Sequence, residues 1–148
     1  MKLIFNILAI SGSALFAGVL LAIGIILGGY WKSLLAPAFL NAFRSNSQFI
    51  PRVIAPVTIA ALVGLAGSIV LSWEDKDART LWLWAAACIV GLLVFTIIWF
   101  APTNAQFAAR SLLIDQVPAK RDRWLMLHNF RIALEALASI LGVIATSR

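Results

Sequence analysis

Long stretches of apolar residues, separated by short clusters of charge, dominate the chain. Three of these stretches, at about 3–30, 53–73 and 81–101, contain no charged residue, and a fourth follows at about 124–146. About 20 apolar residues in a helix cross a hydrocarbon core of about 30 Å. The pattern therefore predicts an all-α, integral membrane four-helix bundle, and residues 1–148 form a single transmembrane domain.

Between the first two spans the pattern changes. Leu35, Phe39 and Phe43 recur at helical spacing among polar residues between 32 and 52, as in a helix that lies in the membrane interface. We therefore expect a short interfacial helix between spans one and two. It is either a lid or lateral gate, or a connecting helix packed against the bundle end with no functional role.

The ends of the spans are set by length and by proline. The first uncharged run would measure about 42 Å as a straight helix, so it must tilt, protrude or end early. The third run is too long for one level span, and Pro102 is expected to end it near Ala101. We expect a basic loop from 110 to 123, with Pro118 as a breaker, and a fourth helix that starts near Trp124.

Composition agrees with a membrane protein, because the chain is 62% hydrophobic and only 12% charged. Its net charge of +6 does not indicate nucleic acid, since the basic residues are not gathered on a polar surface with interleaved aromatic residues. The expected surroundings are a lipid bilayer, whose anionic headgroups basic loops favour.

The distribution of basic residues predicts the orientation. The side with both termini and the second loop has Lys2, Lys76, Arg79 and Arg148. The side with the first and third loops has Lys32, Arg44, Arg52, Arg110, Lys120, Arg121, Arg123 and Arg131. We expect the first and third loops in the cytoplasm, with the protein in a bacterial inner membrane.

The fourth span alone carries ionisable side chains well inside it. At 100° per residue, one arc of about 80° holds its polar and indole side chains, namely Trp124, His128, Arg131, Glu135 and Ser139. This face is expected to turn inward, because an ionisable side chain facing hydrocarbon costs at least about 2.5 kcal/mol. Either Arg131 and Glu135 form a pair that fixes helix register, or Glu135 or His128 exchanges protons with a bound substrate.

Single copies of histidine and cysteine limit the chemistry. His128 is the only histidine and Cys88 the only cysteine, so two-histidine haem ligation, paired-cysteine metal sites and an internal disulfide are excluded within one chain. No metal and no cofactor is expected. A lone histidine at a helix start is more often a polar residue of the interface than a catalyst, but other polar residues are expected to converge on its end of the bundle: Asn41, Arg44, Thr103, Asn104 and Gln106.

Several short motifs together resemble a known family. They are Pro37 in Ala36-Pro37-Ala38-Phe39-Leu40 after the first span, Pro56 early in the second, Pro102-Thr103-Asn104 closing the third, and Trp124, His128 and Arg131 opening the fourth. On these residues the chain is similar to the anthrone oxygenase-like family of small four-helix membrane proteins. One position departs from the pattern, since the family often has asparagine where this chain has His128.

The resemblance implies cofactor-independent oxygenation of a hydrophobic aromatic substrate. A phenolic tricyclic anthrone would lose a proton, and its carbanion would react with oxygen to give a quinone. His128 would be the base, Arg131 and Asn104 would stabilise the oxyanion, and Trp124 would stack on the substrate. Thr103, Asn41 and Arg44 are further candidate substrate-binding residues, and Glu135 is a further candidate catalytic residue.

Two other classes of function stay open at this point, because a fold does not fix a function. One is a non-catalytic subunit or assembly factor of a membrane complex, working with a partner protein or as a homo-oligomer. The other is a protein that binds a quinone or lipid through the same polar residues without turnover.

Overall fold

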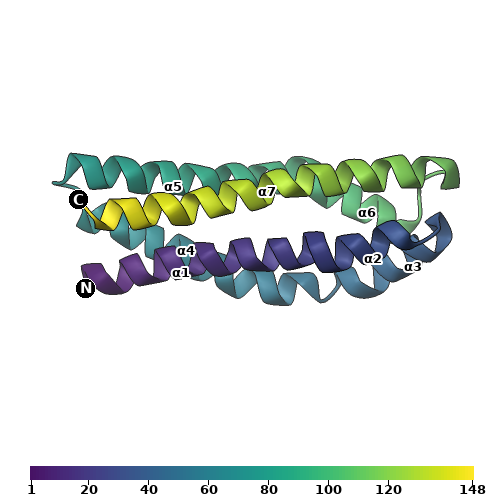
Figure 1. Ribbon diagram of the computed structural model, residues 1–148, viewed down its shortest axis with the longest axis horizontal. Coiled ribbons are helices and arrows are strands. Elements are labelled where there is room, and N and C mark those ends of the chain that lie inside the picture. The colour runs from purple at the N-terminus through teal and green to yellow at the C-terminus, as the bar shows by residue number, and fades with distance from the viewer.

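The computed structural model describes residues 1–148 and contains helices and no strand. Four helical segments are long and apolar enough to cross a membrane: Lys2–Ser33, Ile50–Leu71, Lys76–Ala109 and Ile114–Thr146. They run side by side as an elongated bundle (Figure 1). The prediction of an all-α membrane helix bundle is confirmed.

Two of the long segments are α-helices interrupted by a π-helical turn. The first consists of α1 (Lys2–Ala22), the π turn η1 (Ile23–Leu27) and α2 (Gly28–Ser33). The third consists of α5 (Lys76–Phe95), the π turn η2 (Thr96–Phe100) and α6 (Ala101–Ala109). Between them lie α3 (Ala36–Ser47) and α4 (Ile50–Leu71), and the 3-10 turn η3 (Ile114–Gln116) leads into α7 (Val117–Thr146).

The two ends of the bundle are different. Both chain termini lie at one end, and α3 and α6 lie at the other (Figure 1). Towards the end with the termini, α1 and α4 are in very close contact, because a Cβ atom on Gly12 would meet the backbone of Ala61, and one on Gly64 would meet the backbone of Ala9. Small residues allow this approach, which drives helix association in lipid through van der Waals contact.

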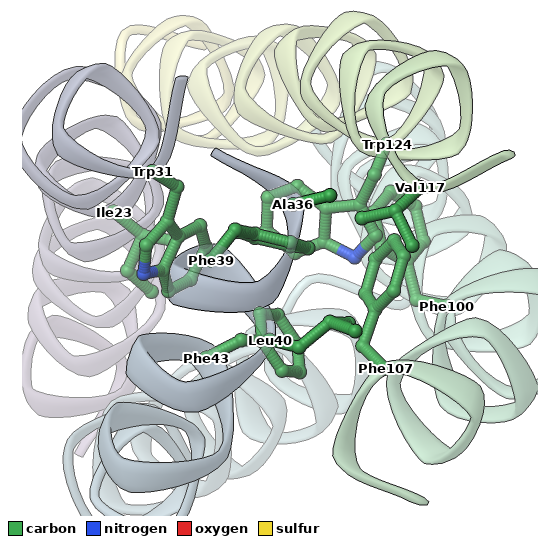
Figure 2. Packing of buried hydrophobic residues seen from close by; sticks show 10 residues of the cluster. All are labelled: Ile23, Trp31, Ala36, Phe39, Leu40, Phe43, Phe100, Phe107, Val117 and Trp124. Atoms are coloured by element: carbon green, nitrogen blue, oxygen red, sulfur yellow. The ribbon is translucent and has the colours of Figure 1, made fainter. Parts of the chain in front are cut away.

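An aromatic cluster fills the opposite end. Phe39 and Phe43 of α3 point inward, towards Trp31, Phe107 and Trp124 (Figure 2). Phe43 lies 5.0 Å from Trp31 and 5.2 Å from Phe107 between ring centroids. The short helix between spans one and two therefore covers this end of the bundle interior with its apolar face.

Two expected helix boundaries are wrong. The third segment does not end near Ala101 but stays helical to Ala109. The ring of Pro102 would clash with the carbonyl group of Ile98 in a regular α-helix, and Ile98 lies in η2, whose wider turn accommodates the proline. The fourth helix begins at Val117 rather than near Trp124, because Pro118 occupies its first turn, where its missing N–H group costs nothing.

Candidate functional site

The polar face of α7 turns into the bundle, as its periodicity predicts. His128 is 1% exposed, Arg131 6% and Glu135 0%. Neighbours at the next positions of the same helix, such as Asn129 and Phe130, are exposed. Past its first turns, the helix thus presents His128, Arg131 and Glu135 to protein, as a membrane span requires.

His128 is held in one orientation by the first long helix. Its Nε2 lies 2.8 Å from the carbonyl oxygen of Leu20, one turn before η1. A carbonyl oxygen only accepts hydrogen bonds, so Nε2 carries the proton and donates, and Nδ1 has a free lone pair. The Nη1 group of Arg131 is 3.4 Å from Nδ1, which is a long and weak contact. The ring therefore presents a basic nitrogen that no strong hydrogen bond occupies.

Trp124 holds His128 from one side. The two rings are stacked with centroids 4.8 Å apart and an angle of 11° between their planes. The indole Nε1 donates a hydrogen bond of 2.8 Å to Oδ1 of Asn104 in α6. This bond fixes the orientation of the Asn104 amide and leaves its NH₂ group as an unused donor. One face of Trp124 is thus covered by His128, which leaves less of the indole for stacking on a substrate than the sequence suggests.

Arg131 lies against an aromatic ring rather than against a carboxylate. Its Cζ atom is 4.4 Å from the centroid of Phe100 in η2, a cation–π geometry. No ion pair joins it to Glu135, and the one salt bridge of the structure is between Arg121 and Asp122, at 3.2 Å. Both carboxylate oxygens of Glu135 and Nε of Arg131 are buried without a hydrogen-bond partner. The pairing that the spacing allowed is therefore not formed.

Asn104, Trp124, His128 and Arg131 line a cavity of about 220 Å³. Its polar lining consists of Ser47, Thr96, Asn104, Trp124, His128 and Arg131. The apolar lining consists of Phe16, Ile23, Phe43, Ile50, Pro51, Ile54, Leu92 and Leu93. Ligand pockets of about 300–1,000 Å³ are common for drug-sized molecules, so this space suits a compact molecule.

Some residues expected at the site lie elsewhere. Asn41 and Arg44 are exposed, because the inward face of α3 is formed by Phe39, Leu40 and Phe43. The side chain of Asn41 instead accepts a hydrogen bond from Arg110. Thr103 is buried, and neither it nor Glu135 lines the cavity.

Other residues enter the site that sequence reasoning missed. Thr96 and Ile23, one in each π turn, both line the cavity, and Phe100 supports Arg131. Single π turns inside α-helices frequently mark functional sites. No pattern of hydrophobic and polar positions indicates a π turn, although Pro102 is a signal that the helix before it must deform. The geometry groups a basic nitrogen, an amide donor and a guanidinium group in an apolar cavity, which is suited to proton abstraction and oxyanion stabilisation.

Comparison with known proteins gives a family for this chain. A family model described as anthrone oxygenase matches residues 39–141, from α3 to α7, which include every polar residue that lines the cavity. No curated protein and no solved structure was found to match the chain. No group of three histidine, cysteine, aspartate or glutamate side chains in the structure is placed to hold a metal ion. On the family match over most of its length, this chain belongs to the anthrone oxygenase family.

Proposed function

We propose that the protein catalyses the oxygenation of a flat, hydrophobic aromatic ketone of the anthrone type within the membrane, without a cofactor. The observation that supports this most is the grouping of His128 Nδ1, the free amide group of Asn104 and the Arg131 guanidinium around one apolar cavity. An apolar cavity takes up both a tricyclic aromatic molecule and oxygen.

The reaction begins with a proton transfer. The methylene carbon between the aromatic rings loses a proton to Nδ1 of His128, and the negative charge is delocalised onto the ketone oxygen. The amide group of Asn104 and the guanidinium group of Arg131 stabilise that oxygen. Fixed donors aimed at a developing charge contribute most in a site that excludes water.

Oxygen then completes the conversion. The carbanion forms a carbon–oxygen bond with O₂, and the resulting peroxide takes up a proton and loses water to leave a carbonyl group. Overall, one methylene group and one O₂ give one carbonyl group and one H₂O. The substrate supplies all the electrons, so the balance needs no other reductant.

The direct test is oxygen consumption by the purified protein in lipid nanodiscs with anthrone as the substrate. We expect one anthraquinone formed per O₂ consumed, at a rate well above that of empty nanodiscs. His128→Asn, which keeps a polar amide but removes the base, is expected to lower the rate by about 10²–10⁴-fold. Asn129→Ala, one residue away on the exposed face of α7, is the matched control and is expected to keep it.

Arg131 is tested in the same assay. Arg131→Met should lower the rate by about 10²–10³-fold if the guanidinium group stabilises the oxyanion. The control Arg123→Met removes an exposed arginine of the same helix and should not change the rate. Wild-type rates in both His128→Asn and Arg131→Met would remove these roles.

The same cavity also favours a second candidate, a quinone-binding protein without turnover. It has room for a flat quinone beside the free amide donor of Asn104. Retention of anthraquinone by the nanodisc-embedded protein, together with no oxygen consumption above background, would favour this function over the oxygenase.

A further inference from the structure

A second hollow lies on the outer surface, where η1 approaches the joint between α3 and α4. Its volume is about 380 Å³, and all its lining residues except Asn46 are hydrophobic. Ile26, Phe49 and Val53 in its wall are each more than half exposed. Because the exterior of a membrane bundle is in contact with lipid, an apolar hollow here would open towards the lipid.

The two hollows are neighbours. Ile23 of η1 and Ile50 of α4 line both the outer hollow and the inner cavity that contains His128. These two side chains, which we call the partition, therefore lie between the outer hollow and the candidate site. The partition consists of two aliphatic side chains, and no hydrogen bond or ion pair joins them.

The helices beside this partition are packed less closely than elsewhere. Towards the termini, α1 and α4 touch through Gly12 and Gly64. At the level of the partition, η1 has replaced α1, and η1 is not closely packed against α4. The same stretch of helix carries the carbonyl group that holds His128, and Gly24 of η1 lies directly against the histidine ring.

A route to the cavity through the bundle end is blocked by side-chain packing. The aromatic cluster of α3, α6 and α7 fills that end (Figure 2). Arg121 of α7 also donates hydrogen bonds to the carbonyl oxygens of Trp31 and Leu34, at 3.0 and 2.9 Å, and so ties α7 to the end of α2. A substrate coming from water through this end would have to displace this packing, whereas the outer hollow and the inner cavity are in contact through Ile23 and Ile50.

We propose that the gap between η1 and the start of α4 is a lateral portal, through which a flat aromatic substrate moves from the lipid into the His128 cavity. The outer hollow is its first docking position, and Ile23 with Ile50 form the gate. This inference rests on the proposed function for the identity of the substrate. It adds the path and the residues that control access.

Residues that line only the outer hollow allow the portal to be blocked without changing the cavity. Ala22→Phe and Val53→Phe each place a ring in the outer hollow. Ile25→Phe and Ile59→Phe are matched controls, because both side chains are exposed and line neither hollow. The probe is anthraquinone added to nanodiscs, followed by stopped-flow quenching of tryptophan fluorescence. Phenylalanine is used because it leaves this signal unchanged.

A blocked portal slows binding and release together. We expect both rate constants to fall by about tenfold in Ala22→Phe and Val53→Phe, with an equilibrium dissociation constant within about threefold of wild type. The controls should bind and release as the wild type does. The two variants lie on different helices, so the test still works if one of them misfolds. An unchanged dissociation constant shows that the cavity itself is intact.

Three other outcomes can be told apart. If anthraquinone binds to all variants with wild-type rates, the portal is wrong while the proposed function stands. If the wild type shows no binding at all, the substrate class is wrong and the proposed function fails with it. Slower rates in the two controls as well would also overturn the portal, because the effect would then be one of the lipid-facing surface in general.

Discussion

At the scale of single residues, three ionisable side chains of α7 are buried close to one another. His128, Arg131 and Glu135 are buried, and only His128 has a strong hydrogen bond. Buried polar groups in proteins are usually satisfied, so each exception calls for an explanation. For Arg131, which lines the cavity, a ligand with a polar group would supply the missing partner, whereas Glu135 does not line the cavity.

Glu135 gives a prediction at this scale. Its carboxyl group is fully buried and has no hydrogen-bond partner, so Glu135→Met should stabilise the fold by about 1–3 kcal/mol. The replacement has a similar length and no polar atom. Thermal unfolding in detergent measures it, with the exposed Glu74→Met as the control. A lower unfolding temperature in Glu135→Met would show that the carboxyl group has a stabilising partner in the membrane.

The site was only partly predictable from residues. Helical periodicity identified the inward face of α7, because ionisable side chains that faced lipid would cost too much free energy. It could not show that Arg131 would lie over Phe100 instead of pairing with Glu135, because that choice depends on the position of η2. It also could not exclude Asn41, whose place on α3 depends on which face of that helix meets the aromatic cluster.

At the scale of elements, uncharged length predicted the four spans but not the deformations within them. A π turn depends on the packing of the surrounding helices and leaves no hydrophobic period. Proline was ambiguous for a related reason. Pro118 lies in the first turn of α7, and Pro102 lies just after a π turn inside a continuous helical segment. In a sequence, a proline can equally mark the start of a helix or its termination. The sequence predicted the short helix α3 but left its role open. The structure shows that α3 covers one end of the bundle, because Phe39 and Phe43 pack into the aromatic cluster.

The contact between α1 and α4 gives a prediction at this scale. Gly64→Leu would force a side chain into the backbone at Ala9, so it should destabilise the bundle by at least about 1–3 kcal/mol. Gly91→Leu on α5 is the control, because open space surrounds that position, and it should leave stability unchanged or raise it by up to about 1 kcal/mol, since glycine disfavours a helix. Thermal unfolding in detergent separates the two. Equal stability of the two variants would mean that α1 and α4 do not pack as described.

At the scale of the whole molecule, the bundle has one closed end with the aromatic cluster and one end with both termini (Figure 1). The cavity lies on the side of the closed end, where α7 carries most of its charge. We propose that this closed end faces the cytoplasm, because the loops on that side carry the larger number of basic residues.

Cysteine labelling tests the orientation. Exposed positions near the closed end, Ser45 and Ser111, and near the termini, Asp77 and Ser147, are replaced one at a time by cysteine in a Cys88→Ala background. In spheroplasts, a membrane-impermeant maleimide should label the pair near the termini and leave the other pair unlabelled until the membrane is broken. The opposite pattern would invert the orientation without affecting the site.

The central claim is that His128 removes a proton from an aromatic methylene carbon inside the membrane. Its most direct test needs no oxygen: anthrone is incubated with the nanodisc-embedded protein in D₂O under anaerobic conditions, and deuterium at the methylene carbon is followed by mass spectrometry. We predict exchange well above that of empty nanodiscs, lowered by about 10²–10⁴-fold in His128→Asn and unchanged in Asn129→Ala. Exchange equal to that of empty nanodiscs, or equally fast in His128→Asn, would contradict the claim.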